Sequence, residues 1–313
     1  MRYRNGYRDD SQIGQSIVKT RDTFAARPGV PEISEAAADP ATRAIYAEIK
    51  AASGTPLVNL VYRHFATLDG MLPWAWTTIR DGLTVDALVK SAARLPALSG
   101  LPGLPDSAFV SIGVSPDALK TLRILIDDYN RTNAFNLVAM SALEHILERH
   151  RGDDIRVSPS HPIRPIAGTG AAPAILSFDD LSDETSELVL ALNRICDSEN
   201  PRCLATMYRQ FANWPSLLAL TLGYLRGLEQ GGVLAAAKIS VLDAGRMEAR
   251  ALVAEIADRL PVAPPPTDRA VAAAALSMFV TEVIGKMIPI GQALAHFFAD
   301  GAPQPIASAN SRA

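Results

Sequence analysis

Two short segments of the chain carry the same aromatic and basic residues 146 positions apart. Tyr62 and Arg63 begin the segment YRHFATLDGMLPWAWTTIR, and Tyr208 and Arg209 begin YRQFANWPSLLALTLGYLR. A tyrosine hydroxyl and an arginine guanidinium both donate hydrogen bonds, and a guanidinium can hold a carboxylate with two of them. These pairs could therefore contact the carboxylate of a small acid. The alternative is structural: each arginine ties helices together through carbonyl or carboxylate groups, and each tyrosine fills a seam between helices.

Several other side chains could take part in acid–base chemistry. His64 follows the first Tyr-Arg pair and could titrate near neutral pH, although a hydrogen-bonded helix residue is the more common situation. Asp127 and Asp128 stand on a predicted helix, where we expect them to be solvated. His145 and His296 occupy equivalent places in two similar segments, and we interpret both as packing residues.

The cysteine and histidine spacings favour neither a metal site nor a disulfide framework. Cys196 and Cys203 are separated by six residues, which is typical of free thiols in a reducing compartment. No H-x-x-x-H or E-x-x-H spacing predicts a metal site, and the segment SGLPGLP lacks the lysine of a phosphate-binding loop.

Composition and charge indicate a globular protein. The chain has 313 residues, of which 48% are apolar and 20% are charged, with a net charge of -3. These values are typical of a folded domain, and no excess of positive charge points to nucleic acid or an anionic membrane. The N-terminus has no apolar signal region, and Glu282, Lys286 and Pro289 interrupt the apolar stretch 272–298. We therefore expect a cytoplasmic protein without membrane or nucleic-acid partners, and a homodimer is an open alternative to a monomer.

Helical periodicity and capping residues predict an all-α fold. Asp39-Pro40 predicts the start of a helix, and Gly54 predicts its end. Ser115-Pro116 predicts the start of a long helix that could break near Asn133. Thr267 or Asp268 could cap a final helix that reaches about Phe298. We predict a flexible N-terminal arm (1–38), a first helical repeat (39–150), a proline-rich linker (151–181), a second helical repeat (182–300) and a disordered tail (301–313).

The similarity of the two segments predicts a duplicated helical unit. Six of the nineteen aligned positions are identical without a gap: Tyr62, Arg63, Phe65, Ala66, Leu72 and Arg80 match Tyr208, Arg209, Phe211, Ala212, Leu218 and Arg226. Two tandem copies would pack around a pseudo-two-fold axis as an intrachain pseudo-dimer. Helix bundles often place binding sites in such a seam.

Three segments carry a resemblance to a known family. PLVNLVYRHFATLDGMLPWAW, LIDDYNRTNAFNLVAMSALE and FANWPSLL resemble the group I 2-haloacid dehalogenases, the DehI family of the AhpD-like superfamily. The resemblance covers roughly residues 40–300 and implies two all-α halves joined by a long linker. It also implies a hydrolase that removes halide from a small 2-halocarboxylic acid by direct water attack, with inversion and without a covalent intermediate, metal or cofactor.

The resemblance implies a set of site residues and one departure from the family pattern. Asn133 falls at the asparagine that holds the attacking water, but Met207 falls at the position of the aspartate that activates it. Methionine cannot accept the proton, and general-base assistance commonly contributes about a hundredfold to ten-thousandfold in rate. The expected pocket-lining residues are Leu57, Asn59, Leu60, Tyr62, Asn136, Ala205, Thr206, Met207 and Tyr208, with Arg63 and Arg209 as carboxylate contacts.

Three functional hypotheses follow from these observations. The first is a divergent 2-haloacid dehalogenase with another base, and the second is the same fold binding or converting a different small molecule between the repeats. The third is an AhpD-like thiol enzyme, which Cys196 and Cys203 support poorly because no close cysteine pair or neighbouring histidine accompanies them.

Overall fold

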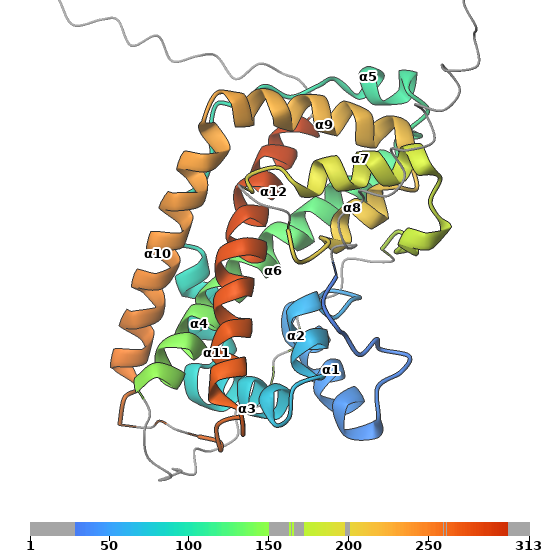
Figure 1. The fold of residues 1–313 in the computed structure, drawn as a ribbon. Coiled ribbons are helices and arrows are strands. Elements are labelled where there is room, and N and C mark those ends of the chain that lie inside the picture. The colour runs from blue at the N-terminus through green and yellow to red at the C-terminus, as the bar shows by residue number, and fades with distance from the viewer. Residues whose placement is uncertain are drawn as a thin grey trace, which may run out of the picture.

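The chain folds into a bundle of α-helices (Figure 1). The structure is a computed structural model that describes residues 29–149, 163, 165, 172–197, 201–258, 260 and 262–299. No β-strand occurs in these described ranges, so the all-α prediction is confirmed. Most of the predicted arm and linker, and all of the predicted tail at 301–313, lie outside the described residues.

The first half of the chain forms short helices, and the first of them has the bounds that its capping residues predict. They are α1 (Pro40–Ser53), α2 (Leu60–Phe65), α3 (Met71–Thr77), the π-helical turn η3 (Thr78–Leu83), α4 (Val85–Ala92) and α5 (Asp106–Ser111). The Asp39 carboxylate accepts a hydrogen bond from the backbone N–H of Thr42 at 2.7 Å, and Gly54 ends α1 with a positive φ of 64°. Both predicted boundaries of α1 are therefore confirmed.

A single helix of 34 residues, α6 (Pro116–Arg149), runs through the middle of the bundle (Figure 1). The Ser115 hydroxyl accepts from the backbone N–H of Ala118 at 3.2 Å, which confirms the predicted helix start. The sequence left open a break near Asn133. None forms, because no proline or glycine follows Pro116 within α6.

The second half contains the longer outer helices. Its elements are the 3-10 turn η4 (Phe178–Asp180), α7 (Asp183–Asn193), α8 (Thr206–Phe211), α9 (Pro215–Gln230), α10 (Val233–Glu255), α11 (Arg269–Met278), the π-helical segment η5 (Phe279–Ile284) and α12 (Gly285–Phe297). Asp268 caps α11 by accepting from the backbone N–H groups of Ala270 and Val271. Residues 269–297 form one continuous apolar helix that is long enough to cross a membrane, but 61% of its apolar window is buried inside the bundle. The structure is thus consistent with a soluble protein.

The two predicted repeats share their hydrophobic cores. One core joins α1–α4 to the C-terminal half of α6 and to α11, and the other joins the N-terminal half of α6 to α7–α9 and α12. Helix α6 contacts α4, α10, α11 and α12, so it belongs to both cores. Helices α2 and α8 are offset by 146 residues, as in the sequence comparison, while the duplication itself stays a prediction.

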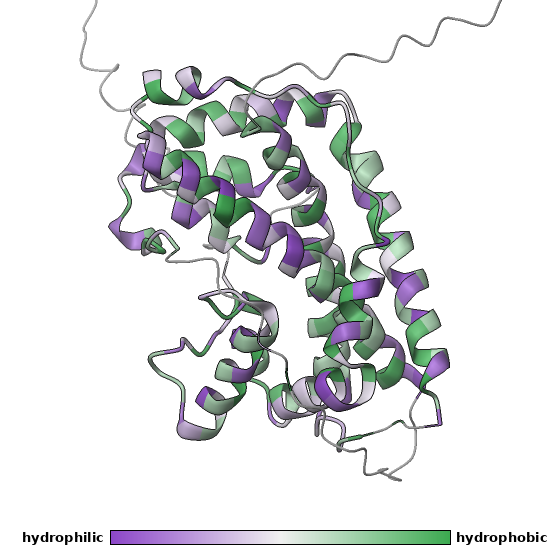
Figure 2. Cartoon of the chain, turned by 180° about the vertical axis from the view of Figure 1, so that it is seen from behind, coloured by the Kyte–Doolittle hydropathy of each residue, from purple (hydrophilic) through white to green (hydrophobic). Residues whose placement is uncertain are grey.

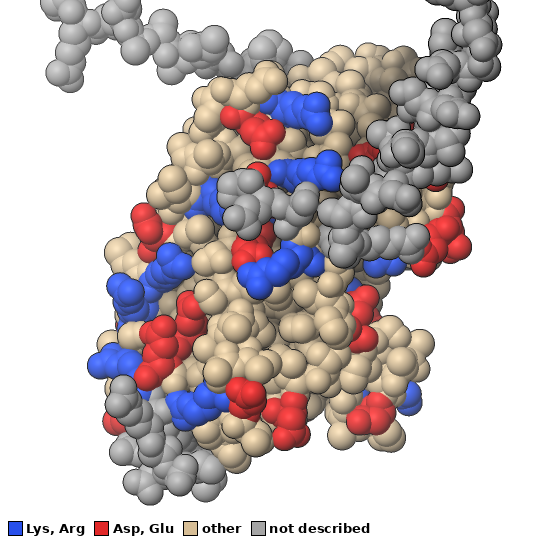
Figure 3. All heavy atoms as spheres, viewed as in Figure 1, with Lys and Arg blue, Asp and Glu red and all other residues tan. Residues whose placement is uncertain are grey.

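The surface is polar and carries charges of both signs. Figure 2 shows apolar helix faces turned toward the interior, and Figure 3 shows Lys and Arg interspersed with Asp and Glu over the visible face. Such mixing fits the small net charge of the chain. One charged side chain is buried: Lys286 of α12 contacts the partly buried carboxylate of Asp197, and its ammonium donates to the Asn193 carbonyl at 2.6 Å.

Candidate functional site

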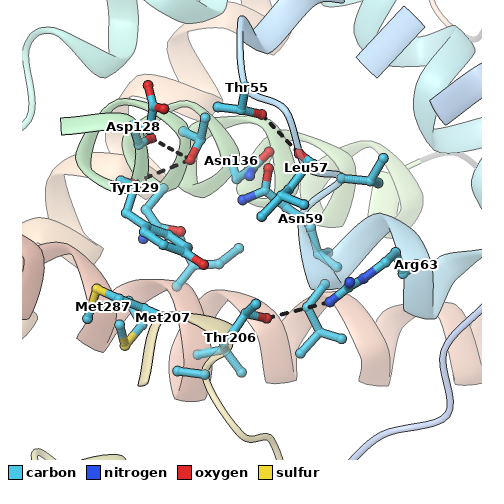
Figure 4. A pocket seen from close by; sticks show the side chains of 18 of the residues that line it. Thr55, Leu57, Asn59, Arg63, Asp128, Tyr129, Asn136, Thr206, Met207 and Met287 are labelled. Atoms are coloured by element: carbon cyan, nitrogen blue, oxygen red, sulfur yellow. Dashed lines mark hydrogen bonds between the residues drawn. The ribbon is translucent and has the colours of Figure 1, made fainter. Parts of the chain in front are cut away.

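A cavity lies where α2, the middle of α6, α8 and the η5–α12 segment meet (Figure 4). Its volume is about 90 Å³, whereas a single water needs about 10–15 Å³ measured in this way. It can therefore hold a small organic molecule. The wall consists of Thr55, Pro56, Leu57, Val58, Asn59, Leu60, Val61, Arg63, Leu125, Asp128, Tyr129, Thr132, Asn133, Asn136, Ala172, Ile175, Ala205, Thr206, Met207, Phe279, Val283, Ile284 and Met287.

The segment before α2 brings Asn59 to the cavity. Asn59 precedes the first residue of α2, but its side chain makes no capping hydrogen bond to the helix. The backbone before it is fixed, because the Thr55 hydroxyl donates to the Leu57 carbonyl at 2.9 Å and the Val58 N–H donates to Glu35 at 3.0 Å. The Asn59 amide is consequently held at the cavity wall with its own hydrogen-bonding groups available.

The segment before α8 is held by a buried asparagine. The Asn193 amide donates to the Cys203 carbonyl at 2.8 Å, and its oxygen accepts from the Ala205 N–H at 3.0 Å. These two bonds position the first turn of α8, which supplies Thr206 and Met207 to the cavity. Met207 is fully buried in the wall, so the cavity presents a thioether at this point.

Six residues of α6 recur at helical spacing and line the cavity: Leu125, Asp128, Tyr129, Thr132, Asn133 and Asn136. The Tyr62 hydroxyl donates to Oδ1 of Asn136 at 2.8 Å, and both side chains are buried. Since this bond occupies the amide oxygen, Asn136 offers its NH₂ group to the cavity. The Asn133 amide has no hydrogen-bond partner among the described residues and is free to bind water or a ligand.

Arg63 lies at one end of the cavity and points toward Thr206 (Figure 4). Its Nη2 donates a long hydrogen bond of 3.5 Å to the Thr206 hydroxyl, and its Nε lies 2.9 Å from Glu32 Oε2. Arg63 therefore connects α2 to α8 and keeps a guanidinium edge at the cavity, so the structural and ligand-binding roles are compatible.

Residues 29–38, which we call the N-terminal strap, are fastened to α2. The Ile33 N–H donates to the Arg63 carbonyl at 3.0 Å, and His64 Nδ1 is 2.8 Å from the Pro31 carbonyl. His64 is therefore a buried, hydrogen-bonded helix residue that does not line the cavity. This part of the predicted flexible arm is thus held in place.

Residues 172–180, which we call the linker strap, are fastened to α8 in a similar way. Arg209 Nε donates to the Leu176 carbonyl at 2.8 Å, and the Gln210 amide donates to the Pro173 carbonyl at 3.0 Å. The residues that follow each repeated tyrosine thus anchor an extended segment beside the cavity. Anchoring is the structural role that the sequence left open for the two arginines.

A second space, the outer chamber, lies between the two straps. It has a volume of about 210 Å³ and is lined by Gly29, Val30, Glu32, Leu60, Arg63, Ser177, Phe178, Asp179, Leu204, Thr206 and Arg209. Leu60, Arg63 and Thr206 also belong to the cavity wall, so the two spaces adjoin.

The structure brings most of the predicted site residues together. Leu57, Asn59, Leu60, Arg63, Asn133, Asn136, Ala205, Thr206 and Met207 all lie in the cavity wall. Tyr62 and Tyr208 are buried behind it, and Arg209 lines the outer chamber instead. No sequence pattern pointed to Phe279, Val283 and Met287, because their apolar spacing is that of any core helix. Tyr129 and Thr132 could have been inferred, since they share a helical face with Asn133.

One expectation about an acidic residue is wrong. Asp127 is exposed as expected, but Asp128 is buried in the cavity wall. It tolerates burial because Oδ1 lies 2.7 Å from Nη2 of Arg131, which is also tied to the Ser53 carbonyl. Figure 4 shows the Asp128 carboxylate pointing away from the asparagines.

Few groups at the site can titrate. The ionisable side chains of the cavity wall are Arg63, Asp128 and Tyr129. Burial raises the pKa of Tyr129, whose hydroxyl donates to Gln210 at 2.6 Å, so Tyr129 stays a neutral donor. Away from the cavity, burial raises the pKa of Cys196 to about 11 and that of Cys203 to about 12, which disfavours thiolate chemistry. Within the described ranges, no three His, Cys, Asp or Glu side chains are placed to hold a metal.

Comparison with solved structures identifies the fold. A D-2-haloacid dehalogenase mutant superposes with a TM-score of 0.63 at 15% sequence identity, covering 88% of this chain and 97% of that chain. A D-2-haloacid dehalogenase in complex with L-LA gives 0.61 at 16% identity, and a mutant with D-2-CPA gives 0.60 at 16%; each covers 87% of this chain and 97% of the other. No protein-family model and no curated protein sequence matches. The chain therefore has a haloacid dehalogenase-like fold.

Proposed function

We propose that this protein binds a small 2-substituted carboxylic acid in the cavity and has lost the water-attack chemistry of dehalogenases. We further propose that it is a divergent member of the group I family, built from a duplicated unit. The matching offset of α2 and α8 supports the duplication. The proposal depends most on the set of donors that faces the cavity.

Two donors in the cavity wall suit a carboxylate. Tyr62 fixes the Asn136 amide so that its NH₂ group is available, and Arg63 contributes a guanidinium edge. An oxygen that carries negative charge accepts such bonds more strongly than a neutral oxygen does. Glu32 offsets only part of this effect, because it lies in the outer chamber and not in the cavity wall.

The apolar part of the cavity wall suits an apolar or halogen substituent. Met207 of α8, Met287 of α12 and Phe279 of η5 are buried and line the cavity. Methionine adapts its shape to irregular ligands and is polarizable, which favours contact with a methyl group or a heavy halogen. The small volume restricts the part of the ligand held here to a short chain.

The cavity does not favour hydrolysis of the carbon–halogen bond by the family's route. Asn133 can hold a water molecule through its free amide, but an amide does not take up a proton at neutral pH. Position 207, where the resemblance implies the catalytic aspartate, is methionine. Without a base at this position, we expect the hydrolytic step to be slower by about a hundredfold to ten-thousandfold.

One observation supports a second candidate, a dehalogenase that uses another base. Asp128 is a carboxylate in the cavity wall, five residues before Asn133 on the same helix. Its ion pair with Arg131 and its outward direction argue against this role. Halide release by the wild type that disappears in Asp128→Asn would favour this candidate over the binding function.

Isothermal titration calorimetry with 2-chloropropionate and 2-chloropropionamide tests the proposed function. The two compounds have nearly the same shape, but only the acid is charged. We expect the acid to bind at least about tenfold more tightly, which corresponds to one charge-assisted hydrogen bond. Arg63→Met should remove the preference, whereas Arg226→Met, at an exposed site of α9, should keep it. Equal binding of acid and amide to the wild type contradicts the proposal.

We propose in addition that the protein is cytoplasmic and needs no metal or organic cofactor. Its partner is a small molecule, and it binds neither nucleic acid nor a membrane. Burial of most of the apolar helix 269–297 and the mixed surface charges support this proposal. A homodimer stays a prediction, and sedimentation velocity of the full chain will decide it.

A further inference from the structure

The outer chamber contains an arginine, Arg209, that has no ion-pair partner among the described residues. Arg209 is half-buried, and its Nε donates to the Leu176 carbonyl. Its two terminal nitrogens have no partner among the described residues. Burial lowers the pKa of Arg209; the nearby Glu32 carboxylate opposes this shift, and the neighbouring Arg63 charge adds to it. A guanidinium in this situation gains from an anion that enters the chamber.

The other charges of the outer chamber are already engaged. Arg63 Nε lies 2.9 Å from Glu32, so the Glu32 carboxylate is already engaged by Arg63 and offsets part of its charge. Asp179 also lines the chamber and has an interaction partner of its own. Arg209 therefore keeps hydrogen-bonding capacity for an acidic ligand.

The outer chamber and the cavity form adjoining spaces of different character. Leu60, Arg63 and Thr206 belong to both walls. The Asn136 NH₂ group and the Arg63 guanidinium are donors that line the cavity. Arg209 is a donor that lines the outer chamber. A single extended molecule can therefore meet donor groups in both spaces, with its carbon chain passing Leu60 and Thr206.

From this arrangement we propose that the ligand is a dicarboxylic acid, with one carboxylate at Asn136 and Arg63 and the second at Arg209 in the outer chamber. This inference rests on the proposed function, because it assigns a place to the first carboxylate in the same cavity. The inference goes beyond the proposed function because it gives the ligand a second acidic group and a length that spans both spaces. Arg209 then recognises the ligand directly, in addition to anchoring the linker strap.

The test is calorimetric titration of the wild type with straight-chain acids of four to six carbons. Each dicarboxylate is compared with the monocarboxylate of the same length: succinate with butyrate, glutarate with pentanoate, and adipate with hexanoate. We expect at least one dicarboxylate to bind at least about tenfold more tightly than the monocarboxylate of the same length, because it forms a second charge-assisted contact. Arg209→Gln should remove this advantage, so that each dicarboxylate binds no more tightly than the monocarboxylate of the same length.

Two further variants separate ligand recognition from strap anchoring. Arg226→Gln removes an exposed arginine of α9 and should preserve the advantage of the dicarboxylate. Arg209→Lys keeps the positive charge and should retain part of the advantage, although it loses the Nε bond to Leu176. Thermal unfolding of each variant confirms that it is folded.

Failure of this inference can be told apart from failure of the proposed function. If monocarboxylates bind but no dicarboxylate binds more tightly, the second site is refuted and the proposed function stands. If Arg209→Gln weakens both classes equally, Arg209 acts only through the linker strap, and the inference is likewise wrong. If no acid binds the wild type, the proposed function itself fails.

Discussion

Replacing Met207 by aspartate should give this protein dehalogenase activity. Met207 is fully buried in the cavity wall, on the first turn of α8, which Asn193 holds in place. Aspartate at this position introduces a base into a wall that also contains the free amide of Asn133. Relative to the wild type we expect an increase in halide release of about a hundredfold to ten-thousandfold, the usual contribution of a general base.

The substitution has a cost in stability that can be anticipated. Met207→Asp loses the burial of an apolar side chain, about 2–3 kcal/mol, and introduces a carboxylate into a mostly apolar wall. The expected loss is therefore about 3–5 kcal/mol out of a typical total of about 5–15 kcal/mol. Burial disfavours the ionised form of the new carboxyl, so the rate should increase with pH up to the neutral range.

Ion chromatography of halide released from each enantiomer of 2-chloropropionate measures this effect. Met207→Asn is the matched control, because it has nearly the same size and burial but no base. If Met207→Asp is folded and binds the acid but releases halide no faster than Met207→Asn, then Asn133 does not place a water beside position 207. The assignment of the site would then be wrong.

Three further predictions concern groups around the cavity and in the core. Tyr62→Phe leaves the Asn136 oxygen buried without its donor, so the free energy of unfolding should fall by about 1–3 kcal/mol in urea titrations, and acid binding should weaken. Lys286→Met leaves the Asp197 carboxylate without its partner, so the free energy of unfolding should fall by about 3–5 kcal/mol. Adding Asp197→Leu to the same chain should restore most of this loss. A double variant whose loss equals the sum of the two single losses contradicts the prediction. Burial raises the pKa of Glu144, so the folded state holds its proton more firmly and stability should fall as pH rises through that pKa. Glu144→Gln should reduce this loss between acidic and neutral pH in urea titrations, and an unchanged pH dependence contradicts it.

Much of the fold follows from local chemistry in the sequence. Asp39, Ser115 and Asp268 cap helices as predicted, because an oxygen three residues before a free N–H is a local arrangement. The sequence did not predict how the two halves share their cores. Which half of α6 packs against which helices depends on contacts between distant residues, and local patterns do not encode them.

The candidate site was predicted in part. Asn133, Asn136 and Met207 were identified through the family resemblance, and the structure places all three in one wall. The buried position of Asp128 was not foreseen, because a carboxylate on a helix is usually solvated, and its partner Arg131 can be recognised only once the helix face is known. The bond between Tyr62 and Asn136 joins residues 74 positions apart, so spacing alone could not reveal it.

The most direct test of the central claim is to locate a bound acid by its heavy atom. Crystals of the wild-type protein soaked in 2-bromopropionate should show an anomalous bromine peak beside Met207 and Met287, with the carboxylate toward Arg63 and Asn136. A bromine peak outside the cavity, or a carboxylate turned toward the methionines, would contradict the account.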